Sequence, residues 1–377
     1  MKILLCVNSD IGRGNTIGFR FGKIVEELNR QGIAYDILAR ANYDSKLSVT
    51  TPWYKNILAR TLKSIRLFFF PWWTFRSLDV WLFDRFVLSH LKRTQIHYPV
   101  AHVGEYIPKT IDYLKNQDTK VILEIPIAHH NYAVYLKNIG IKSGVRIGNL
   151  PSYLKHALDQ ADACIVPSSF VVDSLTQAGV KKNIYIIPFG VTMPADWSEE
   201  NIIHRAQQKK IIYLFAGNVN YRKGIVYLLE AWQKANLQNA QLIIAGRVFR
   251  EVRSLVNQYL DSSIRYVGFV NLKEYFKQAQ VLVFPTLLEG SAKAVYEAMS
   301  YGLTIVTTPN AGSIVEDGKS GFIVSIANAK QLAEKLQFLH THHEVIADMG
   351  KAAFQRVQGY SWERYVASVV DVYHSFV

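Results

Sequence analysis

Residues 211–235 read IIYLFAGNVNYRKGIVYLLEAWQKA, and this stretch carries the pattern that decides the fold. The apolar run at 211–216 predicts a buried strand, because it is short and ends at a glycine. The amphipathic pattern at 225–235 predicts a helix, and the turn between the two is polar and basic. A strand, a loop and a helix in this order are typical of a parallel sheet covered by helices.

The same alternation extends over the whole chain. One series of expected strands lies at 2–7, 34–38, 100–103, 120–125, 163–166 and 184–187, and a second at 211–216, 241–245, 264–266, 281–284, 304–307 and 322–324. We therefore expect an α/β protein of two doubly wound domains that face each other across a cleft. The expected boundaries are 1–192 for the first domain, 193–209 for a polar linker, 210–360 for the second domain and 361–377 for a helix that packs back on the first.

The composition excludes several classes of protein. Apolar residues make up 49% and charged residues 19% of the 377 residues, which excludes a disordered chain. Two cysteines are too few for a disulfide framework or a metal-ligand cluster, so we expect a cytoplasmic protein. The apolar start is too short for a signal peptide. The longest aromatic-apolar run, 67–73, is also far shorter than the roughly 20 residues of a membrane span.

The charge predicts an anionic partner. The formal net charge is +13, and residues 1–192 hold 24 Lys and Arg against 14 Asp and Glu. A phosphate-bearing substrate, a membrane surface or a nucleic acid would fit such an excess.

A pair of carboxylates follows the expected strand at 281–284. Glu289 falls in the strand-to-helix loop, and Glu297 lies in the next helix. The small residues at 290–292 would leave backbone N–H groups exposed at the helix start, which is an anion site. The carboxylates would repel a phosphate, so they suit the hydroxyls of a ribose or a sugar. The alternative is a loop acid and a solvated helix acid with no shared function.

A basic turn follows the expected strand at 211–216. Gly217 allows a tight turn, while Arg222 offers a planar fork and Lys223 a point charge for a diphosphate. An ordinary basic turn is the alternative. The two loops follow the first and fourth strands of one domain, so we expect them to open on the same edge of the sheet.

Together these segments resemble the retaining family-4 glycosyltransferases of the two-Rossmann-domain (GT-B) fold. The resemblance covers roughly residues 160–377 and is weaker at the start of the chain. It runs in order through 162–168, 187–191, 217–224, 228–232, 242–246, 266–269, 284–286, 289–297 and 312–324. This order and spacing favour the functional interpretation of both loops.

The resemblance implies roles for residues of the second domain. Arg222 and Lys223 would hold the donor diphosphate. Glu297 would bind the ribose hydroxyls, and Glu289 would be a catalytic residue that contacts the transferred sugar. The implied donor-binding set is Gly217, Arg222, Lys223, Gly290, Ser291, Ala292, Lys293 and Glu297, with the backbone N–H groups of 291–293 adding to the phosphate site. Asn218 stands where many members have Arg, and the residues after Gly290 differ from the usual motif, so the donor stays open.

The first domain offers a glycine loop after its first expected strand. Gly12, Arg13 and Gly14 resemble the acceptor-side loop with which the family closes on the diphosphate. A dinucleotide site would look similar. However, Gly12, Gly14 and Gly18 miss the Gly-x-Gly-x-x-Gly spacing by one residue.

Two histidines follow the expected strand at 120–125. His129 and His130 lie in a region where family members often place a His near the transferred sugar. The resemblance makes both candidate catalytic residues and does not decide between them. Two surface histidines in a loop are the alternative.

Residues 53–93 combine cations with aromatic rings. They hold eight Lys and Arg, two Asp and eleven aromatic residues. This mixture suits the headgroup region of an anionic bilayer, so we expect a peripheral protein at the inner face of the membrane. A buried aromatic helix pair and a nucleic-acid surface are the alternatives; we expect no nucleic-acid partner.

The resemblance implies a retaining, hexosyl-type glycosyltransferase. A nucleotide-sugar donor would bind the second domain and a glycan or lipid-linked acceptor the first, in cell-surface polysaccharide or glycolipid synthesis. No cofactor and no metal are expected, because the chain has no Asp-x-Asp and its cations and helix-end amides can stabilise a leaving diphosphate. A sugar-nucleotide epimerase on the same fold and a non-catalytic membrane-binding protein are the alternatives.

Overall fold

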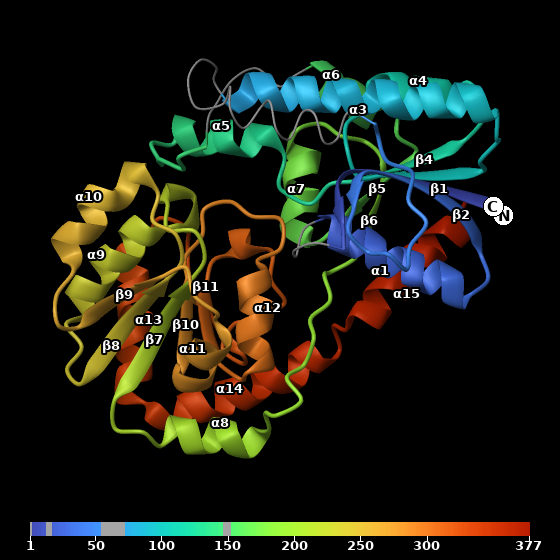
Figure 1. The fold of residues 1–377 in the computed structure, drawn as a ribbon. Helices are drawn as coiled ribbons and strands as arrows, with labels where there is room; N and C mark the ends of the chain where they lie inside the picture. The colour runs from blue at the N-terminus through green and yellow to red at the C-terminus, as the bar shows by residue number, and fades with distance from the viewer. Residues whose placement is uncertain (1, 13–16, 54–71, 146–151) are drawn as a thin grey trace.

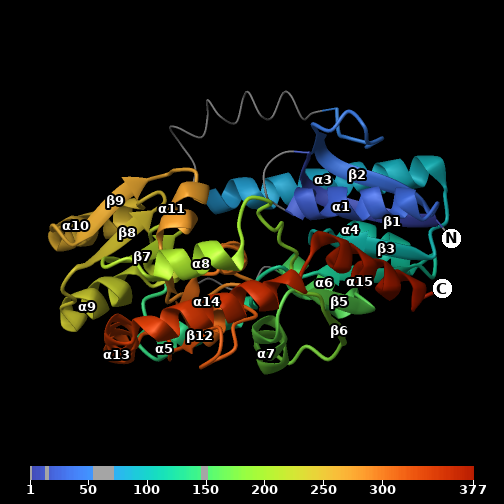
Figure 2. The ribbon, with the colours of Figure 1, turned by 90° about the horizontal axis from the view of Figure 1, so that it is seen from below.

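The structure, a computed structural model, describes residues 2–12, 17–53, 72–145 and 152–377, with the backbone alone for 72–77. Within these residues the chain forms two six-stranded parallel sheets, with helices packed on both faces of each (Figure 1, Figure 2). The two doubly wound domains predicted from the sequence are confirmed. Arg13 and Gly14 of the glycine loop, and 54–71 of the aromatic segment, lie outside the described residues.

The first sheet has the strand order β2-β1-β3-β4-β5-β6. Its strands are β1 (Lys2–Ile11), β2 (Ala34–Asn42), β3 (Val100–Val103), β4 (Lys120–Glu124), β5 (Ala163–Val166) and β6 (Asn183–Ile186). Alternation along β1 supplies both cores, since Leu4 and Cys6 enter one cluster and Ile3, Leu5 and Val7 the other. A run that is apolar at every position is what burial on both faces requires.

The second sheet has the order β12-β11-β10-β7-β8-β9. Its strands are β7 (Ile211–Ala216), β8 (Ala240–Ala245), β9 (Ile264–Gly268), β10 (Val281–Phe284), β11 (Thr304–Thr307) and β12 (Gly321–Ile323). The order reverses between β7 and β10, which pair directly. In open α/β sheets this reversal creates a crevice at the carboxyl ends of the strands, where ligands bind.

Helices complete four layers around the sheets. On the first sheet, α1 (Ile17–Arg30) and α15 (Trp362–His374) share one core, while α3 (Trp72–Thr94), α4 (Pro108–Lys115), α6 (Ser152–Gln160) and α7 (Ser169–Gln177) contribute to the other. The second sheet has α9 (Ile225–Ala235), α10 (Arg250–Tyr259) and α13 (Ala329–Thr341) in one core and α11 (Lys273–Gln278) and α12 (Lys293–Ser300) in the other; α14 (His343–Gln358) contributes to both. The helix α5 (His130–Asn138) lies near the junction of the domains (Figure 1).

The segment predicted as a linker, 193–209, contains a helix, α8 (Glu199–Ala206), which packs on α14. Arg205 anchors it, because its guanidinium is buried and donates to the carbonyl oxygens of Phe276 at 2.8 Å and Gly302 at 2.6 Å. The polar sequence of α8 hides this role, since only Ile202 and Arg205 are buried.

A buried polar network fastens the C-terminal helix to the first domain, as the sequence predicts. Arg20 of α1 pairs with Glu124 of β4 at 2.6 Å. His102 of β3 lies between this pair and α15, with its Nε2 3.6 Å from Glu124 and its Nδ1 2.6 Å from the Tyr373 hydroxyl. Burial, with the charge of Arg20, lowers the pKa of His102 to about 3, so the ring is neutral. With its proton on Nε2, the nitrogen that faces Glu124, its Nδ1 accepts from the Tyr373 hydroxyl.

Removing the Tyr373 hydroxyl should therefore destabilise the protein. Tyr373→Phe leaves a buried imidazole nitrogen without its partner, which costs about 1–3 kcal/mol. Urea unfolding measures the effect. The matched control is Tyr185→Phe, whose partly exposed hydroxyl lies 3.5 Å from Ser375 near the end of the same helix and should matter little. Equal effects of the two substitutions would contradict the stabilising role of the Tyr373–His102 hydrogen bond.

Candidate active site

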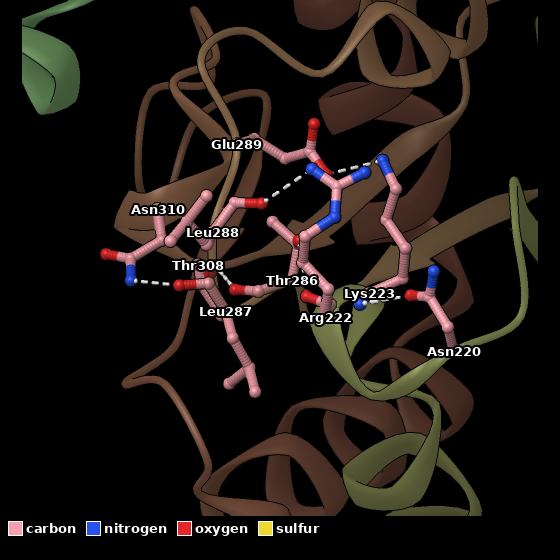
Figure 3. Close-up of polar contacts among 9 residues, drawn as sticks. All are labelled: Asn220, Arg222, Lys223, Thr286, Leu287, Leu288, Glu289, Thr308 and Asn310. Carbon is pink, nitrogen blue, oxygen red and sulfur yellow. Dashed lines mark hydrogen bonds and ion pairs between the residues drawn. The ribbon is translucent and has the colours of Figure 1, made fainter. Parts of the chain in front are cut away.

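Two loops of the second domain meet at the strand reversal. The β7–α9 loop carries Arg222 and Lys223 in a short 3-10 turn, and the β10–α12 loop carries Glu289 (Figure 3). The backbones are joined, since the Leu287 N–H donates to the Arg222 carbonyl at 2.8 Å. A Cβ at Gly224 would lie 1.9 Å from the Pro285 carbonyl oxygen, so only glycine allows this approach. The two loops open on the same edge, as expected.

The cations and the carboxylate are in direct contact. One oxygen of Glu289, Oε1, lies 2.5 Å from Lys223 Nζ and 3.1 Å from Arg222 Nη1. Arg222 also donates to the Leu288 carbonyl at 3.2 Å (Figure 3). Asn220 fixes the turn, because its side-chain oxygen accepts the Lys223 N–H at 3.0 Å. The structure thus joins both predicted phosphate ligands to the predicted catalytic carboxylate.

The cluster has an excess of positive charge. Burial, and the neighbouring charge of Arg222, lower the pKa of Lys223, while Glu289 opposes that shift. The Lys223 ammonium also lies 4.7 Å from the centre of the Phe284 ring. Because one carboxylate faces two cations, the site retains attraction for an anion with several oxygens, such as a diphosphate. Such a ligand would compete with Glu289 for the same two side chains.

The Glu289–Gly290 backbone also touches the first domain. The Ala128 N–H donates to the Glu289 carbonyl at 3.3 Å, and the Ser168 hydroxyl donates to the Gly290 carbonyl at 2.5 Å. A Cβ at Gly290 would lie 1.8 Å from the Pro126 carbonyl oxygen. The domains therefore meet at the same peptide that carries the predicted catalytic carboxylate.

The start of α12 differs from the expectation. The Ala292 N–H donates to the Ala311 carbonyl at 2.9 Å, so it is not free to add to a phosphate site. Ser291 is buried, and Lys293 pairs through its side chain with Glu297 at 3.2 Å. Glu297 thus pairs with Lys293, whereas Arg222 and Lys223 pair with Glu289. The role of Glu297 at a ribose stays a prediction.

His129 and His130 lie at the start of α5 on the first domain. His129 caps the helix, since its Nδ1 accepts the Asn131 N–H at 3.2 Å. The ring is nearly buried, and burial together with His130 lowers its pKa. A neutral His129 therefore carries its proton on Nε2 and can donate a hydrogen bond. Both histidines line a cavity that Arg222 also reaches.

Two cavities meet at Arg222. One, of about 480 Å³, is lined by Tyr106, Ile125, Ile127, Ala128, His129, His130, Ala133, Val145, Leu154, Leu158, Leu175, Arg222 and Leu288. The other, of about 300 Å³, is lined by Gly217, Asn218, Arg222, Lys223, Ala245, Gly246, Phe269, Val270 and Leu272. The first belongs mainly to the first domain and the second to the second domain.

The sequence analysis assigned no role to the residues of the smaller cavity that follow β9. Phe269 is 89% exposed there, and Val270 and Leu272 lie beside it. These residues follow β9, so their position after a strand of the same sheet edge was the available signal. Gly246 is needed for close approach, because a Cβ would lie 1.8 Å from the Gly217 carbonyl oxygen.

Gly12 directly follows β1, has a positive φ of 74° and is exposed, and a Cβ there would lie 2.7 Å from the Asp44 backbone nitrogen. Arg13 and Gly14 follow outside the described residues, so the acceptor-side loop stays a prediction. In the part of the chain that the structure describes, no three His, Cys, Asp or Glu residues gather as a metal site would require.

If a diphosphate replaces Glu289 at the two cations, substitutions of Lys223 and of Glu289 should change nucleotide affinity in opposite directions. Lys223→Ala should weaken binding of a nucleoside diphosphate by about 1.5–3 kcal/mol, because a charge-assisted hydrogen bond is lost. Glu289→Gln should instead tighten binding by about threefold to tenfold, because the competing partly buried ion pair is removed. Calorimetry with UDP, GDP and ADP measures both.

Glu297→Gln serves as the charge-matched control, since its carboxylate pairs with Lys293 and not with the cluster. It should not tighten binding. Weaker binding by Glu289→Gln would show that the carboxylate and the diphosphate do not compete.

Comparison with known proteins identifies both domains. Residues 21–193 match the family model described as Glycosyltransferase Family 4, and residues 210–342 match the one described as Glycosyl transferases group 1. A protein of Salmonella typhimurium whose name assigns it to colanic acid biosynthesis (WcaL) is 29% identical over 153 residues, which cover 36% of this chain and 38% of that protein. The chain spans about half the length of the curated relatives that it matches first.

Solved structures show the same architecture over the whole chain. Sucrose-phosphate synthase from Thermosynechococcus elongatus has a TM-score of 0.71 at 18% identity, with 100% of this chain and 99% of that one covered. The Anabaena protein HepE, solved in complex with UDP, has a TM-score of 0.68 at 14% identity, with both chains covered completely. At these identities the likeness concerns the fold. The two family models together match most of the chain, which belongs to the family-4 glycosyltransferases of the GT-B fold.

Proposed function

We propose that this protein moves a sugar from a nucleotide-sugar donor to a glycan or lipid-linked acceptor with retention of configuration. The observation that carries the proposal is that Arg222, which belongs to the Arg222–Lys223–Glu289 cluster, lines two cavities, one mainly on each domain. A transferase needs such an arrangement, because donor and acceptor must meet at one carbon.

The donor would bind on the second domain. Its diphosphate would take Arg222 and Lys223, whose charges then stabilise the leaving group as the glycosidic bond breaks. The nucleoside would extend into the smaller cavity, where Phe269 offers an exposed ring. Glu289, displaced from the cations, would be free to contact the sugar. The two cations that would stabilise the leaving group are already in place, which is how electrostatic catalysis avoids reorganisation.

The acceptor would enter from the first domain. His129 and His130 line the larger cavity next to Arg222, so they stand where the transferred sugar would lie. The neutral His129 can donate its Nε2 proton to a sugar hydroxyl. Retention and the hexosyl type are proposed from the family, and metal independence from the lack of an Asp-x-Asp motif in the sequence. UDP is the first nucleotide to test, because HepE was solved with UDP.

The place in metabolism is a further part of the proposal. The name of the Salmonella relative assigns it to colanic acid biosynthesis. We infer by analogy that this chain acts in cell-surface polysaccharide or glycolipid synthesis. The sugar-nucleotide epimerase remains the second candidate, since it would use the same donor cluster and need no acceptor.

A panel of UDP-, GDP- and ADP-sugars tests the activity. We expect one donor to be consumed faster when a bacterial membrane-lipid or glycan extract is added, with an α-linked donor giving an α-linked product by NMR. Activity should survive excess EDTA. Release of free epimerised sugar without any acceptor would support the epimerase, and activity restored only by Mn²⁺ or Mg²⁺ would contradict metal independence.

We also propose that α3 and the adjoining Trp53 contact an anionic membrane surface from the cytoplasmic side. One side of α3 packs in the core of the first domain, where Phe83, Val87 and Leu91 are buried. This is what the core-packing alternative predicts for that side. The other side of α3 exposes Trp81, with Arg85 4.7 Å from that ring. Among the helices of the described ranges, none is both long and apolar enough to span a bilayer.

Liposome co-sedimentation tests this surface. Replacing Arg85, Lys92 and Arg93 together by Glu should abolish binding to anionic vesicles, because each basic residue near such a surface contributes about 1 kcal/mol. The control replaces three exposed lysines of the second domain, Lys209, Lys234 and Lys330, by Glu and should retain binding. Equal loss in both variants, or binding that ignores lipid charge, would contradict the proposal.

A further inference from the structure

The larger cavity is unusual for a site that meets a sugar. Thirteen residues of the described part of the chain line it; nine of these are apolar and none is acidic. Its walls come from the β4–α5 loop, α5, α6 and α7 of the first domain, closed by Leu288 of the second. Ala133, Leu158 and Leu175 are buried, so these walls are part of the packed core rather than mobile surface side chains.

The polar groups of this cavity are few and lie where the domains meet. Arg222 is held there by Glu289 and by the Leu288 carbonyl, and His129 is held at the start of α5. Tyr106 and His130 are the other polar residues among the described residues of the lining. A second sugar placed among the leucines would leave its hydroxyls without partners, which costs several kcal/mol. An alkyl group there would instead gain from burial.

The apolar lining therefore favours an acceptor with an apolar group over an acceptor made of sugars alone. We propose that the acceptor carries an alkyl or alkenyl chain, and that the part of the chain next to the accepting group lies in the apolar cavity bounded by Ile127, Ala133, Leu154 and Leu158. This inference rests on the proposed function and narrows it, from a glycan or lipid-linked acceptor to an acceptor with an apolar aglycone. The cavity's continuity with Arg222 places that chain beside the donor cluster.

Straight-chain alkyl β-D-glucosides are the probe. Methyl, butyl, pentyl and hexyl glucosides, each below its micelle concentration, are titrated into the protein with UDP present, and binding is followed by calorimetry. We expect affinity to rise about fourfold for each methylene added, as burial of a CH₂ group predicts. Affinity that does not change with chain length, or no binding of any probe, would overturn the inference.

Two variants place a charge in the cavity. Leu154 is half-buried and Ile127 is partly exposed, so Leu154→Asp and Ile127→Asp should leave the fold intact. Both should abolish the dependence on chain length. The matched control is Ser152→Asp, which adds the same charge to the exposed side of α6 and should keep the dependence. Chain-length dependence that persists in both cavity variants would place the chain elsewhere and overturn the proposal.

The proposed function and the apolar aglycone can be tested independently of each other. If no nucleoside diphosphate or nucleotide-sugar binds the wild-type protein, the donor assignment is wrong, while the alkyl series without UDP still decides the character of the cavity. If donors bind and are consumed but the affinity of the alkyl glucosides does not change with chain length, the transferase proposal stands and the apolar aglycone is excluded.

Discussion

One peptide at the junction of the domains sets the geometry of the site. Glu289 places a single carboxylate oxygen against Lys223 and Arg222, while its backbone and that of Gly290 are hydrogen-bonded to the first domain. The space beside Gly290 is filled by the Pro126 carbonyl, so the two domains approach closely only because that residue has no side chain. Charge balance at Arg222 and Lys223 and contact between the domains therefore depend on the same two residues.

In the proposed mechanism, this arrangement would link donor binding to catalysis. Without a donor, the carboxylate neutralises part of the charge on two partly buried cations, which would otherwise repel each other. A diphosphate supplies more oxygens for the same cations and would release Glu289 toward the sugar. The fold makes this possible, because β7 and β10 are neighbours at the strand reversal and their loops end at one edge.

The strands, and the proximity of Arg222, Lys223 and Glu289, could be predicted from the sequence, for different reasons. Strands such as 211–216 are buried on both faces, which leaves an unmistakable apolar run, and Arg222, Lys223 and Glu289 follow neighbouring strands. The helix α8 was missed because it buries only Ile202 and Arg205. The Ala292 amide was misjudged because its acceptor, Ala311, lies in another loop and only the tertiary structure brings them together.

A structure of the protein with a bound nucleotide-sugar tests the central claim most directly. The distance between Lys223 Nζ and Glu289 Oε1, which is 2.5 Å here, is the quantity to measure. The account predicts that diphosphate oxygens replace Glu289 at both Lys223 and Arg222, while the Ser168–Gly290 hydrogen bond remains. A donor bound with Glu289 still paired to both cations would contradict it.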